Sequence, residues 1–298
     1  MAPARELSVP AEAAGARLDV WLAQVLGDVS RAAAAGLIDS GAVLVDGVVR
    51  PKGARLAGGE RVWVEEVADV TLAPSVEPRL TWEGERFVVV DKPPGLVVHP
   101  APGHRGVTLV EWLAGRYPDW DAKAVHRLDR DTSGLMLVAK GEAAQRELQA
   151  ALRRREVVRE YLALATGRLK SRTGTIDAPL GRDVRRRTRM STRTDTPREA
   201  RTHFDVERFA GPHTLVRARL ETGRTHQIRA HFAAIGHPLA GDRDYGARDD
   251  LGLRRQFLHS ARLGLPAPPE GTWREWESAL PADLAEALAR AESRDTGR

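Results

Sequence analysis

The chain has 298 residues, 42% of them hydrophobic, which is enough for one large domain and a small one with real cores. It contains no cysteine, which excludes disulfides, thiolate nucleophiles and cysteine-ligated zinc. No run approaches the roughly 18 to 20 apolar residues of a membrane helix, and the N-terminus lacks the apolar segment of a signal peptide. We therefore expect a soluble cytoplasmic protein with no membrane partner.

The net charge is small but unevenly distributed. It is formally +5, and 41 of the 46 basic residues are Arg. Residues 1–70 carry seven basic and ten acidic side chains, so residues 71–298 carry 39 and 31, a net of +8. Eight Arg fall between Arg182 and Arg201 in a polar stretch. This stretch predicts either a basic surface loop for a polyanion or a loop that is only solvated.

The first part of the chain predicts a small separate domain. "RLDVWLAQVL" places its apolar residues on one helical face, and Ser30 is a suitable N-cap for a second short helix. "AVLVDGVV" alternates around Asp46-Gly47, which is typical of a two-residue hairpin. Prolines then mark a linker. We expect a domain over residues 1–70 and a linker over 71–80.

The second part predicts a larger domain over residues 81–285, followed by a C-terminal tail over 286–298. Strands are expected at Phe87–Val90, Gly134–Val138, Glu156–Ala165 and Thr214–Leu220. Helices are expected at Thr108–Arg116, Glu142–Arg154 and about His226–Ile235, the last with Ile228, Phe232 and Ile235 on one face. Strands and helices do not alternate regularly, which favours an α+β fold over a doubly wound α/β fold.

The stretch "AVHRLDRDTSGLMLVAKG" places a charged cluster directly before an apolar strand. Arg127 and Asp129 are two residues apart, so an extended backbone points both side chains the same way. An arginine within about 4–6 Å keeps a carboxylate ionised. That suits a nucleophile or base better than a general acid. The alternative interpretation is that Arg127 and Asp129 form an ion pair that only stabilises the loop.

The stretch "GRTHQIRAHF" begins a helix with cations at its N-terminus. Arg224 and His226 lie where the helix dipole disfavours positive charge unless an anion is bound there. A phosphate or the carboxylate of Asp129 would resolve this conflict. Arg229 lies beside the apolar face and could enter a half-buried site. A surface helix with incidental charge is the alternative.

Other motifs are weaker or absent. Tyr161, inside an apolar segment, is typical of a core aromatic, and Lys92 beside a Pro-Pro-Gly turn is a possible phosphate contact. The sequence has no P-loop, no G-x-G-x-x-G after a strand and no G-x-S-x-G elbow. A zinc-dependent base deaminase would need cysteine ligands and is excluded.

Taken together, these motifs resemble the RluA/RluD family of pseudouridine synthases. "VVDKPPGLVVHP", "HRLDRDTSG", "EYLAL", "TGRTHQIRAH" and "GHPLAGDRDYG" follow one another in the family's order. Residues 15–66 resemble the alpha-L RNA-binding domain of its RluD-like branch. The resemblance implies a pseudouridine synthase fold, with a large mixed, mainly antiparallel sheet, flanking helices and a catalytic cleft, preceded by a small N-terminal RNA-binding domain.

The resemblance also implies roles for individual residues. Asp129 would be the essential catalytic aspartate, and Arg229 would pair with it. Tyr161 would pack on the target base and take part in proton removal, and Arg127 would help to displace the flipped base. The further residues expected to contact RNA are His126, Arg130, Arg224, His226, Lys92 and Arg31.

The family converts specific uridines of RNA, typically of large-subunit ribosomal RNA, to pseudouridine without a metal or cofactor. The resemblance therefore implies a monomeric isomerase that acts on ribosomal RNA or a pre-ribosomal particle. A synthase for tRNA or for several RNAs, and a non-catalytic RNA-binding ribosome assembly factor, are the alternatives. The N-terminal domain departs from the family in one respect. "AAAAGLIDS" follows Ser30-Arg31 where a basic helix is usual.

Overall fold

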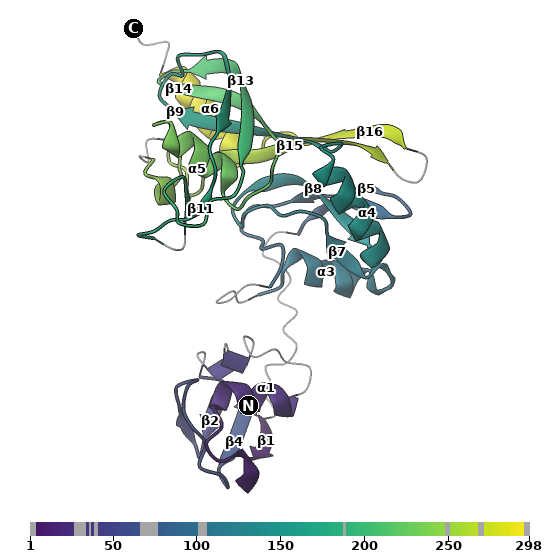
Figure 1. The fold of residues 1–298 in the computed structure, drawn as a ribbon, viewed down its shortest axis with the longest axis vertical. Helices are drawn as coiled ribbons and strands as arrows, with labels where there is room; N and C mark the ends of the chain where they lie inside the picture. The colour runs from purple at the N-terminus through teal and green to yellow at the C-terminus, as the bar shows by residue number, and fades with distance from the viewer. Residues whose placement is uncertain are drawn as a thin grey trace. The chain divides into compact units, whose positions relative to one another are not determined.

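The computed structural model describes residues 4–26, 34–35, 37–38, 41–65, 77–100, 106–186, 189–247, 251–267 and 271–294. The chain divides into two compact units (Figure 1). One unit comprises Met1–Ala73 with Pro100–Val107, and the other Pro74–His99 with Thr108–Arg298. Across the described ranges, no helix has both the length and the apolar character needed to span a membrane.

The first unit is a small α+β domain. Its antiparallel sheet has the order β1-β4-β2-β3. The elements are β1 (Ala4–Ser8), η1 (Ala11–Ala13), α1 (Leu18–Leu26), β2 (Val43–Val45), β3 (Val48–Val49) and β4 (Arg61–Glu65). The predicted hairpin is confirmed, because Asp46 and Gly47 turn between β2 and β3 with φ of 50° and 79°. The second expected helix lies mostly outside the described residues.

The second unit is built on a ten-stranded sheet. Its order is β10-β13-β14-β9-β15-β8-β6-β5, with β16 beside β15 and β7 beside β8. The strands are β5 (Arg79–Glu83), β6 (Phe87–Lys92), β7 (Ala122–Ala124), β8 (Ser133–Lys140), β9 (Val158–Thr166), β10 (Thr173–Asp177), β13 (Arg201–Ala210), β14 (His213–Leu220), β15 (Leu258–Ala267) and β16 (Thr272–Glu277). Among the strands that the structure describes, only β8 and β15 pair in parallel, so the expected mixed, mainly antiparallel sheet is confirmed.

Helices cover both faces of this sheet (Figure 1). They are α3 (Leu109–Arg116), α4 (Gly141–Arg153), α5 (Gln227–Ala234) and α6 (Ala282–Ser293), with short turns η2 (Pro118–Trp120) and η3 (Arg243–Tyr245). Strand β6 shows why two layers form, since its side chains alternate between faces. Val88 and Val90 share a core with α3 and α5, whereas Phe87 and Val89 share one with α4.

Two boundaries differ from the sequence-based expectation. Helix α6 continues past residue 285, where a tail was expected, because Leu288 and Ala291 pack in the same core as Leu284. Ile235 lies just beyond α5 and is 40% exposed, so it does not share the buried face of Ile228. Strands β13 and β15 are absent from the expected elements. A short hairpin of β11 (Gly181–Arg182) and β12 (Met190–Ser191) lies within the basic stretch.

The parallel contact between β8 and β15 requires a glycine. Gly134 pairs with Ser260 and has φ of +110°, and a Cβ at this position would lie 2.3 Å from the backbone oxygen of Ser260. Glycine alone fits such a close approach in this conformation. The charged loop that carries Asp129 ends where β8 begins, so this contact fixes the base of that loop.

Candidate active site

The loop before β8 is anchored to the end of β6 by Lys92. The ammonium group of Lys92 is fully buried and donates to the backbone oxygens of Pro93, Leu96 and Arg130, at 2.8, 2.9 and 2.9 Å. Burial lowers the pKa of Lys92 to about 7. Because Arg130 follows Asp129 directly, this lysine holds the backbone next to that carboxylate.

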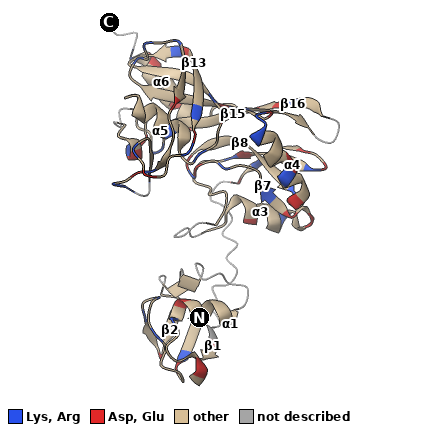
Figure 2. Ribbon diagram, viewed as in Figure 1, with Lys and Arg blue, Asp and Glu red and all other residues tan. Residues whose placement is uncertain are grey.

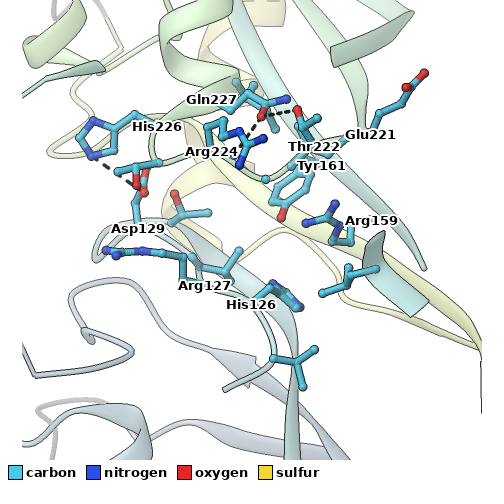
Figure 3. A pocket seen from close by; sticks show the side chains of 18 of the residues that line it. His126, Arg127, Asp129, Arg159, Tyr161, Glu221, Thr222, Arg224, His226 and Gln227 are labelled. Carbon is cyan, nitrogen blue, oxygen red and sulfur yellow. Dashed lines mark hydrogen bonds and ion pairs between the residues drawn. The ribbon is translucent and has the colours of Figure 1, made fainter. Parts of the chain in front are cut away.

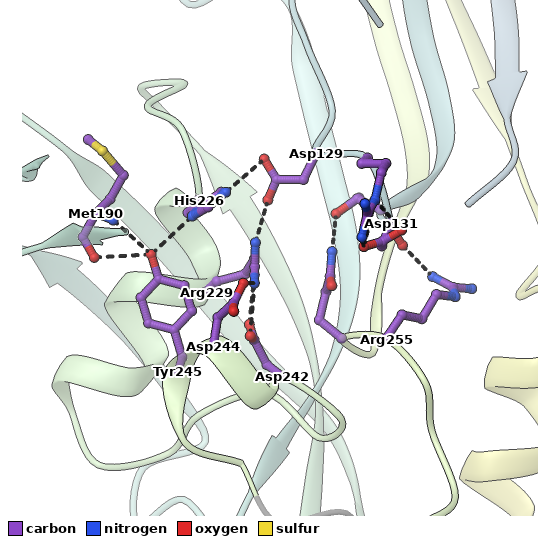
Figure 4. A network of polar contacts seen from close by, with 12 residues as sticks. Asp129, Asp131, Met190, His226, Arg229, Asp242, Asp244, Tyr245 and Arg255 are labelled. Carbon is purple, nitrogen blue, oxygen red and sulfur yellow. Dashed lines mark hydrogen bonds and ion pairs between the residues drawn. The ribbon is translucent and has the colours of Figure 1, made fainter. Parts of the chain in front are cut away.

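The other side of the loop is anchored by residues that lead into β15. The guanidinium of Arg255 donates to the backbone oxygen of Asp131 at 3.0 Å and pairs with Asp283 of α6 at 2.7 Å (Figure 4). The side chain of Gln256 donates to the Thr132 hydroxyl at 3.1 Å, and both residues are buried. The loop is therefore pinned on two sides by buried polar contacts, which gives its side chains a fixed direction.

Asp129 contacts Arg229 of α5, the pairing that the family resemblance implies. The distance from Nη1 of Arg229 to Oδ2 of Asp129 is 3.3 Å (Figure 4). Arg229 is held more tightly by two other carboxylates. Asp242 accepts from Nε and Nη2 at 2.7 and 2.9 Å, and Asp244 accepts from Nη2 at 3.0 Å. Burial by itself would lower the pKa of Arg229, but the neighbouring carboxylates have the larger combined effect, so the pKa of Arg229 is raised.

His226 lies on the other side of the Asp129 carboxylate. Its Nε2 is 3.9 Å from Oδ1 of Asp129, and its Nδ1 is 3.2 Å from the Tyr245 hydroxyl, which donates to the backbone oxygen of Met190 (Figure 4). Burial lowers the pKa of His226, against the opposing effect of Asp129. The residue has φ of +54°, a strained conformation for a non-glycine residue and one that is typical of functional sites.

A cavity of about 640 Å³ opens beside Asp129, within the size range of ligand sites. Tyr161 of β9 and Arg127 of the loop line it, with Arg224 and His226 from the segment before α5 (Figure 3). Tyr161 is 4% exposed, and burial raises the pKa of its phenol, so it is neutral at pH 7. The cavity thus combines a carboxylate, an aromatic ring and several cations.

Comparisons with known proteins match both units. A family model described as RNA pseudouridylate synthase matches residues 86–234, half of the chain, and a model of the S4 domain matches residues 16–62. "Ribosomal large subunit pseudouridine synthase D" of Pseudomonas aeruginosa is 43% identical over 301 residues, covering 94% of this chain and 93% of that protein. The chain belongs to the RNA pseudouridylate synthase family.

Two further relatives agree with this assignment. "Uncharacterized RNA pseudouridine synthase" of Chloroflexus aurantiacus is 42% identical, covering 97% of this chain and 94% of that protein. The solved structure "Human RNA Pseudouridylate Synthase Domain Containing 1" has a TM-score of 0.55 and 27% identity, covering 72% of this chain and 95% of that one. The expected family and N-terminal RNA-binding domain are confirmed, and the protein is an RNA pseudouridine synthase.

In this synthase, Lys92 and His126, both expected to contact RNA, have no free positive charge to offer it. All the N–H groups of Lys92 are used by backbone carbonyls, and the side chain is inaccessible. Nε2 of His126 accepts from the N–H of Leu137 at 3.1 Å, and burial, with the nearby Arg159, lowers the pKa of His126 to about 3. The expectation that Lys92 contacts a phosphate is wrong, because the fold buries its ammonium group, whereas the expected RNA contact of His126 stays a prediction.

The other residues expected to contact RNA differ in whether they line a cavity. Arg127 and Arg224 line the 640 Å³ cavity. Arg130 pairs with Asp131 at 2.8 Å and lines a second cavity of about 380 Å³, which Arg229 also lines. Arg31 lies outside the described residues. These positions make Arg127 and Arg224 the better candidates for contact with an RNA strand that enters beside Asp129.

The basic stretch from Arg182 to Arg201 is only partly free to meet a polyanion. Arg201 pairs with Asp177 at 2.7 Å and Glu221 at 3.2 Å, and Arg189 lies over the ring of Tyr245. Figure 2 shows basic and acidic positions interspersed in both units of the synthase. Of the described arginines in this stretch, Arg201 is thus neutralised by carboxylates and Arg189 is held against a ring.

The carboxylates that hold Arg229 were not predicted from the sequence. Asp242 and Asp244 lie in "GHPLAGDRDYG", which carried the family resemblance without assigned roles. The sequence gives only indirect evidence of this contact, because Asp242 and Asp244 come 13 and 15 residues after the arginine that they bind. Within the described part of the synthase, no group of three or more His, Asp or Glu side chains could hold a metal ion.

Proposed function

We propose that this synthase acts on uridines of large-subunit ribosomal RNA. The name of the Pseudomonas aeruginosa relative supports this substrate, as does the presence of an S4 domain in the same chain as the catalytic unit. We further propose that it works as a monomer in the cytoplasm during ribosome biogenesis. Mapping pseudouridines in RNA from cells that lack the gene tests the substrate. Loss of a pseudouridine from tRNA alone would contradict it.

Asp129 is proposed to carry the chemistry. Isomerisation breaks the bond between N1 and C1′, turns the uracil over, joins C5 to C1′ and releases the C5 proton. An ionised Asp129 serves this reaction either by bonding to C1′ or by taking the C2′ proton in a glycal route. The single observation that carries this role is its 3.3 Å contact with Arg229 beside the cavity, because this contact holds the carboxylate at the cavity wall.

Tyr161 and Arg127 are proposed to hold the target nucleotide. A base stacked in a helix cannot turn over, so it must leave the stack and enter a pocket. The Tyr161 ring, at the wall of the cavity, offers a surface on which the uracil can stack. Arg127 is exposed at the same cavity and can occupy the gap that the base leaves.

Asp129→Asn tests the proposed role of the aspartate. We expect the release of tritium from RNA labelled at uracil C5 to fall on the order of 10⁴-fold, since the amide can neither attack C1′ nor take a proton. RNA binding, measured by filter retention, is expected to persist. Asp131→Asn is the matched control in the same loop and should change the rate by less than about threefold. Substantial turnover by the Asp129→Asn enzyme would rule the role out.

A further inference from the structure

Arg159 of β9 is a buried cation for which the described residues provide no acidic partner. It is 6% exposed, and its Nε is buried without a hydrogen bond. Burial lowers its pKa, and Tyr161 is the one group that opposes this shift. Arginine nevertheless remains charged at neutral pH. Burying an unpaired charge costs several kcal/mol, so the site favours a ligand that supplies an acceptor.

Gly223 keeps space beside this guanidinium. A Cβ at Gly223 would lie 2.9 Å from Nη1 of Arg159. Both residues line the 640 Å³ cavity, so the arginine faces the same space as Asp129. Any larger residue at this position would push the guanidinium away from the cavity wall.

His126 adds a second unused donor next to Arg159. Because its Nε2 accepts from the backbone N–H of Leu137, the neutral ring carries its proton on Nδ1. Nδ1 is buried and has no hydrogen-bond partner in the described structure. Both residues line the cavity, and each has a buried N–H without a hydrogen-bond partner among the described residues.

These donors and the carboxylate lie at different ends of the cavity. In Figure 3, Tyr161 lies between Asp129 on one side and Arg159 on the other. The phenol of Tyr161 also experiences the charges of both residues. A nucleotide whose C1′ meets Asp129, and whose base extends along Tyr161, would bring the oxygens of that base toward Arg159.

We propose that Arg159, assisted by Nδ1–H of His126, binds a carbonyl oxygen of the target uracil and stabilises the negative charge that develops on the base when it leaves C1′. This inference rests on the proposed function. When N1–C1′ breaks, its electron pair stays on the uracil and spreads over N1, O2 and O4. C1′ then bonds to Asp129, or C2′ loses a proton to it. C5 then bonds to C1′ as the oxygen of Asp129 leaves C1′, or as Asp129 returns the proton to C2′ of the glycal. The C5 proton is lost afterwards and N1 is protonated.

Arg159 is buried more deeply than Arg155, and this difference favours the uracil base over a phosphate as the ligand of Arg159. Arg155 lines the same cavity with a side chain that is 51% exposed, whereas Arg159 is almost fully buried. Phosphates of an entering strand stay near solvent and meet the outer arginines first. A flipped base reaches the inner wall. Donors there also disfavour cytosine, whose amino group would face them in place of O4.

The test compares Arg159→Met on two RNA substrates under single-turnover conditions. One RNA carries uridine at the target position, and the other 5-fluorouridine, whose fluorine stabilises the departing base anion. Disappearance of the target nucleoside is measured by mass spectrometry. We expect Arg159→Met to slow the uridine reaction about 10²-fold and the 5-fluorouridine reaction much less. Arg159→Lys keeps the charge and is expected to fall between the wild type and Arg159→Met.

Arg146→Met is the matched control, because Arg146 is 71% exposed and does not line the cavity. Its rates should stay within about twofold of the wild type. Equal slowing of both substrates by Arg159→Met would overturn the inference. So would a weaker RNA affinity with an unchanged single-turnover rate, which would identify a phosphate contact. A wild-type enzyme that converts no uridine in any RNA tested would remove the proposed function and this inference with it.

Discussion

The guanidinium of Arg229 contacts three carboxylates, and their geometry is unequal. Asp242 takes two hydrogen bonds and has a side chain that is 1% exposed, whereas Asp129 takes one longer bond. A bidentate pair fixes the direction of an arginine better than a single contact does. Asp242 therefore determines where Arg229 meets the proposed catalytic carboxylate, although Asp242 itself does not face the 640 Å³ cavity.

Asp242→Asn is expected to destabilise the enzyme and to slow it. Removing one partner of a buried pair costs about 3–5 kcal/mol, because the other charge stays buried. Urea unfolding measures this loss, and tritium release should fall about 10- to 100-fold as Arg229 shifts. Asp244→Asn is the control, since that carboxylate is 65% exposed and should cost less than about 1 kcal/mol. Equal losses in the two variants would contradict this role of Asp242.

The motifs reveal which residues meet, but not which are buried. The resemblance of "HRLDRD" and "GRTHQIR" to the family's motifs predicted that Asp129 and Arg229 pair, whereas the spacing of the residues alone left this open. Lys92 was misread because a lysine beside a turn looks the same in sequence whether it meets a phosphate or three backbone carbonyls. Arg159 was overlooked among neighbouring charged residues, since only the fold reveals that it lacks an acid.

At the scale of elements, the loop that carries Asp129 is positioned by β6 on one side and β15 on the other. Strand β6 was expected from its apolar run. Strand β15 was not, because its sequence "LHSARLGLPA" mixes polar and apolar residues without alternation. Nearly all of its side chains are buried, since it lies between β8 and β9 in the middle of the sheet. Pairing with strands that are distant in the sequence therefore makes this segment a strand, although its own pattern of apolar residues does not predict one.

Gly134→Ala should disrupt the junction of β8 with β15. The new Cβ meets the backbone of Ser260, so the strands must separate, and we expect a loss of about 3 kcal/mol or more with a large fall in activity. Gly141→Ala is the matched control, because Gly141 also has positive φ but nothing lies within 4 Å. It should cost only about 1 kcal/mol. Thermal unfolding and tritium release together distinguish the two, and similar values for both variants would contradict the close-contact argument.

Lys92 should give the enzyme a pH-dependent stability. Its pKa is about 7 in the folded protein and 10.5 in the unfolded chain. Between these values the unfolded chain binds more protons, so stability rises with pH by up to about 1.4 kcal/mol per unit, and it is flat below about pH 7. Lys92→Met should lose this rise, as judged by urea unfolding between pH 7 and 10. Lys123→Met, which removes an exposed lysine, should keep it, and an unchanged slope in Lys92→Met would refute the assignment.

At the scale of the whole molecule, the two units have separate cores. The core of the N-terminal unit contains only residues between Leu7 and Val64, and the other cores contain only residues from Leu80 onward. Every described contact of the Asp129 loop comes from the second unit. The S4 unit, with its net charge of −3 over residues 1–70, therefore serves substrate selection rather than chemistry in our proposal.

Deletion of residues 1–70 should therefore leave the chemistry intact. We expect the truncated enzyme to release tritium from a short RNA at a rate within about threefold of the full chain, because its cores are complete. Its affinity for ribosomal RNA, or its choice among uridines, should fall. Circular dichroism establishes that the truncated chain is folded. Complete loss of activity in a folded truncation would contradict this division of labour.

The contact between β8 and β15 also has a consequence for the newly made chain. Ser133 and His259 are 126 residues apart, and Arg255 and Gln256 must arrive before the Asp129 loop is held. Consider a chain still on the ribosome, with residues beyond about 250 inside the exit tunnel. Asp129, the proposed nucleophile, is already outside the tunnel, but the residues that hold its loop are not. Such long-range closure is slow and comes late. The Asp129 loop of a growing chain is therefore held in place only after β15 can pair with β8 and β9.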